Sequence, residues 1–88
     1  MSLEKYVKKV VNGVYDSFGK TERKYAAITK ESLEDDITRM EPEITHGGEF
    51  YLKSNVYDYY ENDKTVDEAI YGIYTELFPY VVAQLNVM

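Results

Sequence analysis

The chain has 88 residues, 44% hydrophobic and 30% charged, which is typical of a small folded domain and not of a disordered segment. It contains no cysteine, which excludes a disulfide framework and thiolate metal sites, and no apolar stretch reaches the roughly 18 residues of a membrane span. The N-terminus also lacks the apolar core of a secretion signal. We therefore expect a single cytoplasmic domain over residues 1–88.

Charge is unevenly distributed along the chain, whose formal net charge is -6. Residues 1–24 carry six Lys or Arg and three Asp or Glu, whereas residues 25–88 carry four and thirteen. The net charges of the two parts are therefore +3 and -9. The negative charge of the larger part favours a basic partner.

An amphipathic helix is predicted for residues 3–18. Its apolar residues recur three and four positions apart along one helical face: Leu3, Tyr6, Val7, Val10, Val11, Val14, Tyr15 and Phe18. Ser2 is the expected N-cap, and Gly19 the left-handed residue that ends the helix. Gly13 costs about 1 kcal/mol relative to Ala inside a helix, so we expect close packing or a bend there.

The middle of the chain predicts short elements. We expect a polar connection over residues 20–24, then a strand or the first turns of a helix over residues 24–28, with the strand favoured. Ser32 and Asp35 resemble a capping box for a short helix that buries Leu33, Ile37 and Met40 and ends before Pro42. Residues 43–46 and 49–52 then predict two strands joined by a Gly47-Gly48 hairpin turn.

Two further helices are expected in the last third of the chain. Ser54 is the expected cap of a brief helix that holds Val56, Tyr57, Tyr59 and Tyr60. Thr65 and Glu68 match a capping box at the start of a long amphipathic helix, in which Pro79 predicts a kink or a restart. The fold class predicted from these elements is α+β: two long terminal helices packed with a short middle helix and a small antiparallel hairpin, with a mainly α fold as the alternative.

The residues that most enzymes need are scarce. His46 is the only histidine and lies beside the predicted Gly-Gly turn, so Cys-His dyads and multi-histidine metal sites are excluded. Residues 58–63 do not fit a calcium-binding EF-hand loop, because the third position is Tyr60 and the sixth is Asp63. We therefore predict no enzyme activity, no cofactor and no metal.

Acidic residues interleaved with tyrosine are the remaining candidate for a binding surface. Tyrosine is enriched at protein interfaces, and ordered carboxylates resemble phosphates to a basic partner. The predicted partner-binding residues are Glu34, Asp35, Asp36, Tyr57, Asp58, Tyr60 and Glu61. In the alternative interpretation the acids only keep the domain soluble, and the tyrosines Tyr6, Tyr15, Tyr57, Tyr60 and Tyr74 belong to the core.

Two resemblances bear on function. The segments Phe50-Tyr51-Leu52, Tyr57-Asp58-Tyr59-Tyr60-Glu61 and Thr65-Val66-Asp67-Glu68-Ala69-Ile70 resemble the end of a family of bacterial domains of unknown function. By size and charge, the chain resembles small acidic inhibitors encoded by phages and mobile elements, such as anti-CRISPR proteins and DNA mimics. That resemblance implies a stoichiometric inhibitor that blocks a basic nucleic-acid-binding enzyme, such as a CRISPR nuclease.

Two other functions remain open. The first is a structural or regulatory module that forms homo-oligomers through uncovered apolar helix faces. The second is a nucleic-acid binder that uses its basic residues, which are Lys5, Lys8, Lys9, Lys20, Arg23 and Lys24. The three lysines of the first helix share a face that is more often only solvated, so the leading hypothesis includes no direct contact with nucleic acid or membrane.

Overall fold

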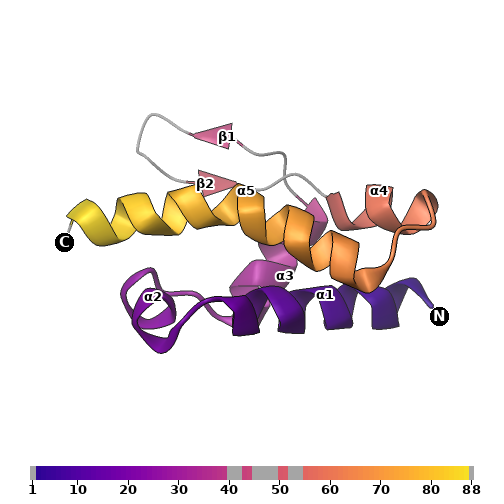
Figure 1. Cartoon of the computed structure of the whole chain (residues 1–88), viewed down its shortest axis with the longest axis horizontal. Coiled ribbons are helices and arrows are strands. Elements are labelled where there is room, and N and C mark those ends of the chain that lie inside the picture. The colour runs from indigo at the N-terminus through magenta and orange to yellow at the C-terminus, as the bar shows by residue number, and fades with distance from the viewer. Residues whose placement is uncertain (1, 40–42, 45–49, 52–54, 88) are drawn as a thin grey trace.

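Two long helices organise the fold, α1 (Leu3–Ser17) and α5 (Val66–Val87), which run side by side in the same direction in the computed structural model (Figure 1). The structure describes residues 2–39, 43–44, 50–51 and 55–87. At a rise of about 1.5 Å per residue, α5 is about 33 Å long and α1 about 22 Å. The C-terminal part of α5 therefore extends past α1.

Helix α1 confirms the first predicted helix. Ser2 accepts a hydrogen bond from the backbone N–H of Lys5 at 3.3 Å. Six of the eight residues of the apolar stripe are buried, with Val10 and Val14 fully enclosed, and Leu3 and Tyr15 are partly buried. The helix ends one residue earlier than predicted, because Phe18 is in an extended conformation. Gly19 is extended as well and is the N-cap of the next helix, so the prediction of a left-handed residue there is wrong.

Helix α2 (Lys20–Tyr25) occupies the segment for which we predicted a polar connection followed by a strand, and both predictions are wrong. Local capping explains the helix. The Glu22 side chain accepts from the backbone N–H of Gly19, which satisfies a donor that a helix start leaves unpaired. The helix stops at Ala26, and Ala27 follows with a φ of 55°.

Helix α3 (Lys30–Arg39) begins earlier than the predicted cap at Ser32. Thr29 is the residue before it, and the two side chains bond reciprocally: Ser32 N–H donates to Thr29 Oγ1 and Thr29 N–H donates to Ser32 Oγ, both at 3.0 Å. The capping box is therefore Thr29 with Ser32 and not Ser32 with Asp35. Leu33 and Ile37 are buried as predicted, whereas Met40 and Pro42 lie outside the described residues.

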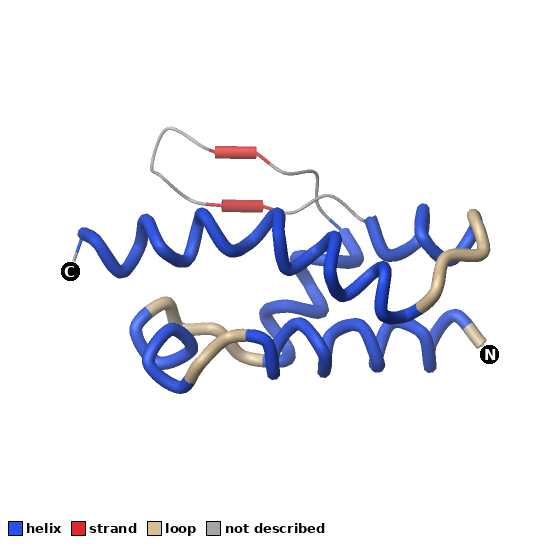
Figure 2. The backbone as a smooth tube through the Cα atoms, viewed as in Figure 1, coloured by secondary structure: helices blue, strands red, loops and turns tan. Residues whose placement is uncertain are grey.

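The strands β1 (Glu43–Ile44) and β2 (Phe50–Tyr51) pair antiparallel, with Glu43 opposite Tyr51 and Ile44 opposite Phe50. The predicted turn at His46, Gly47 and Gly48 lies outside the described residues. Strands of only two residues each are too short to form a layer against which helices pack. The fold is mainly α, as Figure 2 shows, and the predicted α+β class is wrong. The apolar faces of the helices pack against one another in the core.

Helices α4 (Asn55–Glu61) and α5 complete the described fold. The predicted cap of α4, Ser54, lies outside the described residues. The capping box of α5 is confirmed, since Glu68 N–H donates to Thr65 Oγ1 at 3.2 Å and Thr65 N–H donates to the Glu68 carboxylate at 3.4 Å. Helix α5 continues through Pro79 as one element, so the predicted restart does not occur.

One hydrophobic core joins α1, α3, α4 and α5, whereas α2 contributes no buried residue. The buried members of the core are Tyr6, Val7, Val10, Val11, Val14, Phe18, Leu33, Ile37, Val56, Ala69, Ile73, Leu77 and Val81. Two glycines allow the helices to approach closely. A Cβ at Gly13 would lie 2.7 Å from Cγ1 of Ile70, and one at Gly72 would lie 2.8 Å from the ring of Tyr59. Of the two outcomes expected at Gly13, the structure shows close packing.

Candidate functional site

Helix α3 carries three of the seven predicted partner-binding residues and separates them. Successive residues of an α-helix are about 100° apart, so Glu34 and Asp36 lie on opposite sides of the buried stripe of Leu33 and Ile37. Asp35 points away from the core and is exposed. A cluster that is continuous in sequence is therefore divided between two sides of one helix.

Glu34 lies at a hollow of about 280 Å³ between α1, α3 and α4. The hollow is lined by Leu3, Glu4, Val7, Glu34, Thr38 and Tyr57. Three helices thus bring two carboxylates and one tyrosine ring together. Glu4 forms an exposed ion pair with Lys8 at 3.3 Å, so its charge is partly compensated.

The exposed side of α3 continues this acidic region. Glu34 and Asp35 follow Glu31 by three and four residues, and all three are exposed. On α4, Glu61 follows Tyr57 by four residues and therefore lies on the same side of its helix. We call Glu31, Glu34 and Asp35, together with the hollow beside them, the acidic face.

The other predicted residues lie elsewhere. Asp58 lines a smaller hollow of about 130 Å³ with Tyr59, Asn62 and Lys64. The ring of Tyr60 packs edge-on against that of Tyr6, with the two centroids 5.3 Å apart. Asp36 lines a third depression, next to the C-terminal part of α5. The structure therefore brings Glu34 and Tyr57 together but does not unite all seven residues.

Several tyrosines have clear structural roles. Tyr6 is only 4% exposed, and its hydroxyl donates to the backbone carbonyls of Lys64 and Thr65 at 3.2 and 3.4 Å. Burial raises the pKa of Tyr6, and the neighbouring charges of Glu68 and Tyr59 raise it further. Tyr6 thereby joins the start of α1 to the start of α5. Tyr15, Tyr57, Tyr60 and Tyr74 are partly buried against the core.

The basic residues near α2 also hold the fold together. The Arg23 guanidinium lies 4.5 Å from the ring centroid of Tyr15, and it donates to the backbone carbonyls of Tyr15, at 2.9 Å, and Phe18. The Lys30 ammonium lies 5.3 Å from the same ring. Arg23 therefore caps the C-terminal end of α1, where unpaired carbonyls favour a positive charge.

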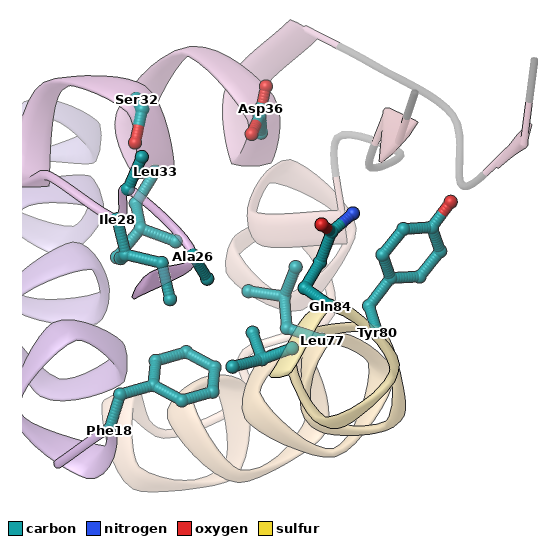
Figure 3. A pocket seen from close by; sticks show the side chains of 11 residues that line it. Phe18, Ala26, Ile28, Ser32, Leu33, Asp36, Leu77, Tyr80 and Gln84 are labelled. Atoms are coloured by element: carbon teal, nitrogen blue, oxygen red, sulfur yellow. The ribbon is translucent and has the colours of Figure 1, made fainter. Parts of the chain in front are cut away.

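A cavity of about 280 Å³ was missed by the sequence analysis (Figure 3). It lies between α3, the connection after α2, and the C-terminal part of α5. Its lining residues are Phe18, Ala26, Ala27, Ile28, Ser32, Leu33, Asp36, Leu77, Tyr80, Val81 and Gln84. We call it the α3–α5 cavity. One sequence signal could have indicated it: residues 77–88 contain no charged side chain in a chain that is 30% charged.

The described residues form neither a metal site nor a membrane span. Within residues 2–39, 43–44, 50–51 and 55–87, no three His, Asp or Glu side chains gather in a way that could hold a metal ion. Among the helices of that same part of the chain, none combines the length and the apolar character of a bilayer-spanning segment.

The comparisons with known proteins gave no match: no family model, no curated protein and no solved structure is similar to the chain.

Proposed function

We propose that the protein is a stoichiometric, non-catalytic inhibitor whose acidic face binds a basic protein, with nucleic-acid-binding enzymes such as CRISPR nucleases as the partner class. One observation carries the proposal. Glu4, Glu34 and Tyr57 come from three different helices and surround a single hollow, and the exposed acids Glu31 and Asp35 continue its rim.

Electrostatics supports a basic partner. The acids of α3 lie on an ordered helix, so the points at which their side chains leave the backbone have a fixed spacing that a mobile segment would not provide. Charges of one sign gathered on one face steer an oppositely charged protein and speed association. Tyr57 adds a stiff ring that is enriched at protein interfaces. Together they offer the charge and the contact area that a nucleic-acid-binding groove recognises.

Affinity capture at two salt concentrations tests this proposal. The immobilised chain is exposed to a bacterial lysate at about 0.05 M and about 0.5 M salt, conditions that differ strongly in electrostatic screening. We expect basic nucleic-acid-binding enzymes to be retained at low salt and lost at high salt. The purified partner should then lose its activity at a one-to-one ratio with the chain.

A pair of charge reversals provides the matched control. Glu34→Lys and Asp16→Lys both replace an exposed helical acid and change the net charge equally, but Asp16 lies on α1, outside the acidic face. We expect Glu34→Lys to weaken retention at least about tenfold and Asp16→Lys to weaken it much less. Equal effects of the two reversals, or capture that is insensitive to salt, would refute the acidic face as the binding surface.

Self-association is a second candidate function, and two exposed aromatic residues favour it. Tyr71 is 72% exposed and Phe78 is 42% exposed, and both lie on α5. They are seven residues apart, so they occupy the same side of the helix. Sedimentation over a range of concentrations tests this candidate. A dimer that dissociates in the Tyr71→Glu variant would support it, and a monomer at every concentration would rule it out.

A further inference from the structure

The α3–α5 cavity has an apolar floor and a polar rim. Phe18, Leu33, Leu77 and Val81 are each at most 6% exposed and form its base. In Figure 3, Ser32 and Asp36 lie on the α3 side, and Tyr80 and Gln84 lie on the α5 side. An apolar group that enters this cavity loses its contact with water, and the polar rim can bond to whatever carries it.

The volume of the cavity indicates the kind of occupant. Pockets for drug-sized ligands span roughly 300 to 1,000 Å³, and this cavity, at about 280 Å³, is slightly below that range. A cavity of this size also has room for one large side chain from another protein. Such buried anchors carry much of the binding energy in many protein interfaces.

Charge indicates what surrounds that side chain. Among the described residues that line the cavity, Asp36 is the one with a charged side chain. Gln84 lies near the C-terminal end of α5, where the helix dipole is equivalent to about half a negative charge. The sequence places no charged residue after Glu76. Cationic groups are therefore favoured at the rim.

The position of the cavity links it to the acidic face. Glu34 and Asp36 lie on opposite sides of α3, so the hollow beside Glu34 and the α3–α5 cavity flank the same helix. The exposed ridge between them carries Asp35. A single partner surface that covers α3 can therefore reach both depressions.

We propose that the α3–α5 cavity receives one large apolar side chain of the basic partner, flanked there by Lys or Arg residues that face Asp36 and the end of α5. This inference rests on the proposed function, because it assumes a basic protein partner. It adds a specificity pocket to a surface that otherwise recognises its partner by charge and by the ring of Tyr57.

Methyl NMR of the whole chain with three peptide probes tests the inference. The first probe, Lys-Lys-Phe-Lys-Lys, has both the apolar side chain and the charges. The second, Lys-Lys-Ser-Lys-Lys, keeps the charges only, and the third, Glu-Glu-Phe-Glu-Glu, keeps the apolar side chain only. We expect the first probe to shift the methyl signals of Leu33, Leu77 and Val81. The same signals should show that the other two probes bind at the cavity at least about threefold more weakly.

Two variants locate the effect. Gln84→Arg places a positive charge at the rim, whereas Ala83→Arg places the same charge at an exposed neighbour that does not line the cavity. We expect Gln84→Arg to weaken binding of the first probe at least about threefold and Ala83→Arg to change its binding little. Equal binding of the Phe and Ser probes, or equal effects of the two arginines, would overturn the inference.

The two proposals can fail separately. Suppose that Glu34→Lys abolishes capture of the basic partner, while Gln84→Arg changes neither this capture nor the binding of the first probe. The cavity is then not an anchor site, and the proposed function stands. If the first probe binds in the cavity but capture is insensitive to salt and to Glu34→Lys, the proposed function fails. The cavity then binds cationic apolar segments without the acidic face.

Discussion

Replacing Gly13 by Ala should destabilise the protein, although Ala is the better helix former. The substitution gains about 1 kcal/mol of helix propensity in the middle of α1. The new Cβ would lie 2.7 Å from Cγ1 and 3.3 Å from Cγ2 of Ile70, whereas carbon atoms prefer about 3.5 to 4.0 Å. Overpacking of this kind costs about 1 to 3 kcal/mol. Because three atoms of a branched side chain, Cδ1, Cγ1 and Cγ2 of Ile70, are affected, we expect a net loss of about 1 to 2 kcal/mol.

The sign of this effect should reverse when Ile70 is shortened. In an Ile70→Ala background the obstructing atoms are absent, so Gly13→Ala should stabilise by about 1 kcal/mol, the propensity gain alone. The coupling energy between the two sites is then about 2 to 3 kcal/mol. Urea unfolding followed by far-UV circular dichroism gives the four free energies of the cycle.

Asn12→Ala provides the control for propensity. Asn12 is exposed and adjacent on the same helix, so its replacement should only stabilise, by roughly 0.5 kcal/mol. If Gly13→Ala stabilises the parent protein as Asn12→Ala does, α1 and α5 are not in close contact at Gly13. An equal effect of Gly13→Ala in both backgrounds would contradict the role of Ile70.

Two further predictions concern side chains that hold the helix ends. Arg23→Met keeps the apolar stem but loses the hydrogen bonds to the carbonyls of Tyr15 and Phe18, so it should lower the free energy of unfolding by about 1 kcal/mol. Arg23→Lys should restore little of this loss, because a single ammonium replaces the planar guanidinium fork. An unchanged urea midpoint in Arg23→Met would contradict the capping role of Arg23. The raised pKa of Tyr6 means that the folded state disfavours ionisation of its hydroxyl. The contribution of the neutral hydroxyl to stability is therefore complete below the ordinary tyrosine pKa of 10.0, and it is lost as pH rises from there through the pKa of Tyr6 in the folded state. Tyr6→Phe should therefore show a smaller loss of stability than the parent between about pH 9 and about pH 11, and identical urea midpoint profiles would show that Tyr6 does not contribute to the alkaline transition.

Local sequence signals were sufficient to predict the two long helices, α1 and α5. The spacing of Val7, Val10 and Val14 predicted α1, and the Thr65 and Glu68 pair predicted the start of α5, because periodicity and capping act over a few residues. The same reasoning failed at α2. The cap from Glu22 to Gly19 is itself a local signal, which the predicted polar connection overlooked, whereas the acceptors of Arg23 lie at the end of α1.

The candidate site was only partly predictable. Sequence analysis identified the acids of α3 and the tyrosines of α4, but it grouped them by their proximity along the chain. A helix turns about 100° per residue, so Glu34 and Asp36 diverge, and Tyr60 packs against Tyr6, a residue far away in sequence. The hollow beside Glu34 depends on how three helices pack together.

Composition and order alone determined that the chain is small, acidic, free of cysteine and divided between a basic beginning and an acidic remainder. They also determined the two long amphipathic helices, since each signal lies within one element. Only the tertiary structure decided that the fold is mainly α, that Glu4, Glu34 and Tyr57 share a hollow, and that a cavity lies between α3 and α5. These features arise where apolar faces of different helices meet, and contacts between residues far apart in sequence leave no local pattern.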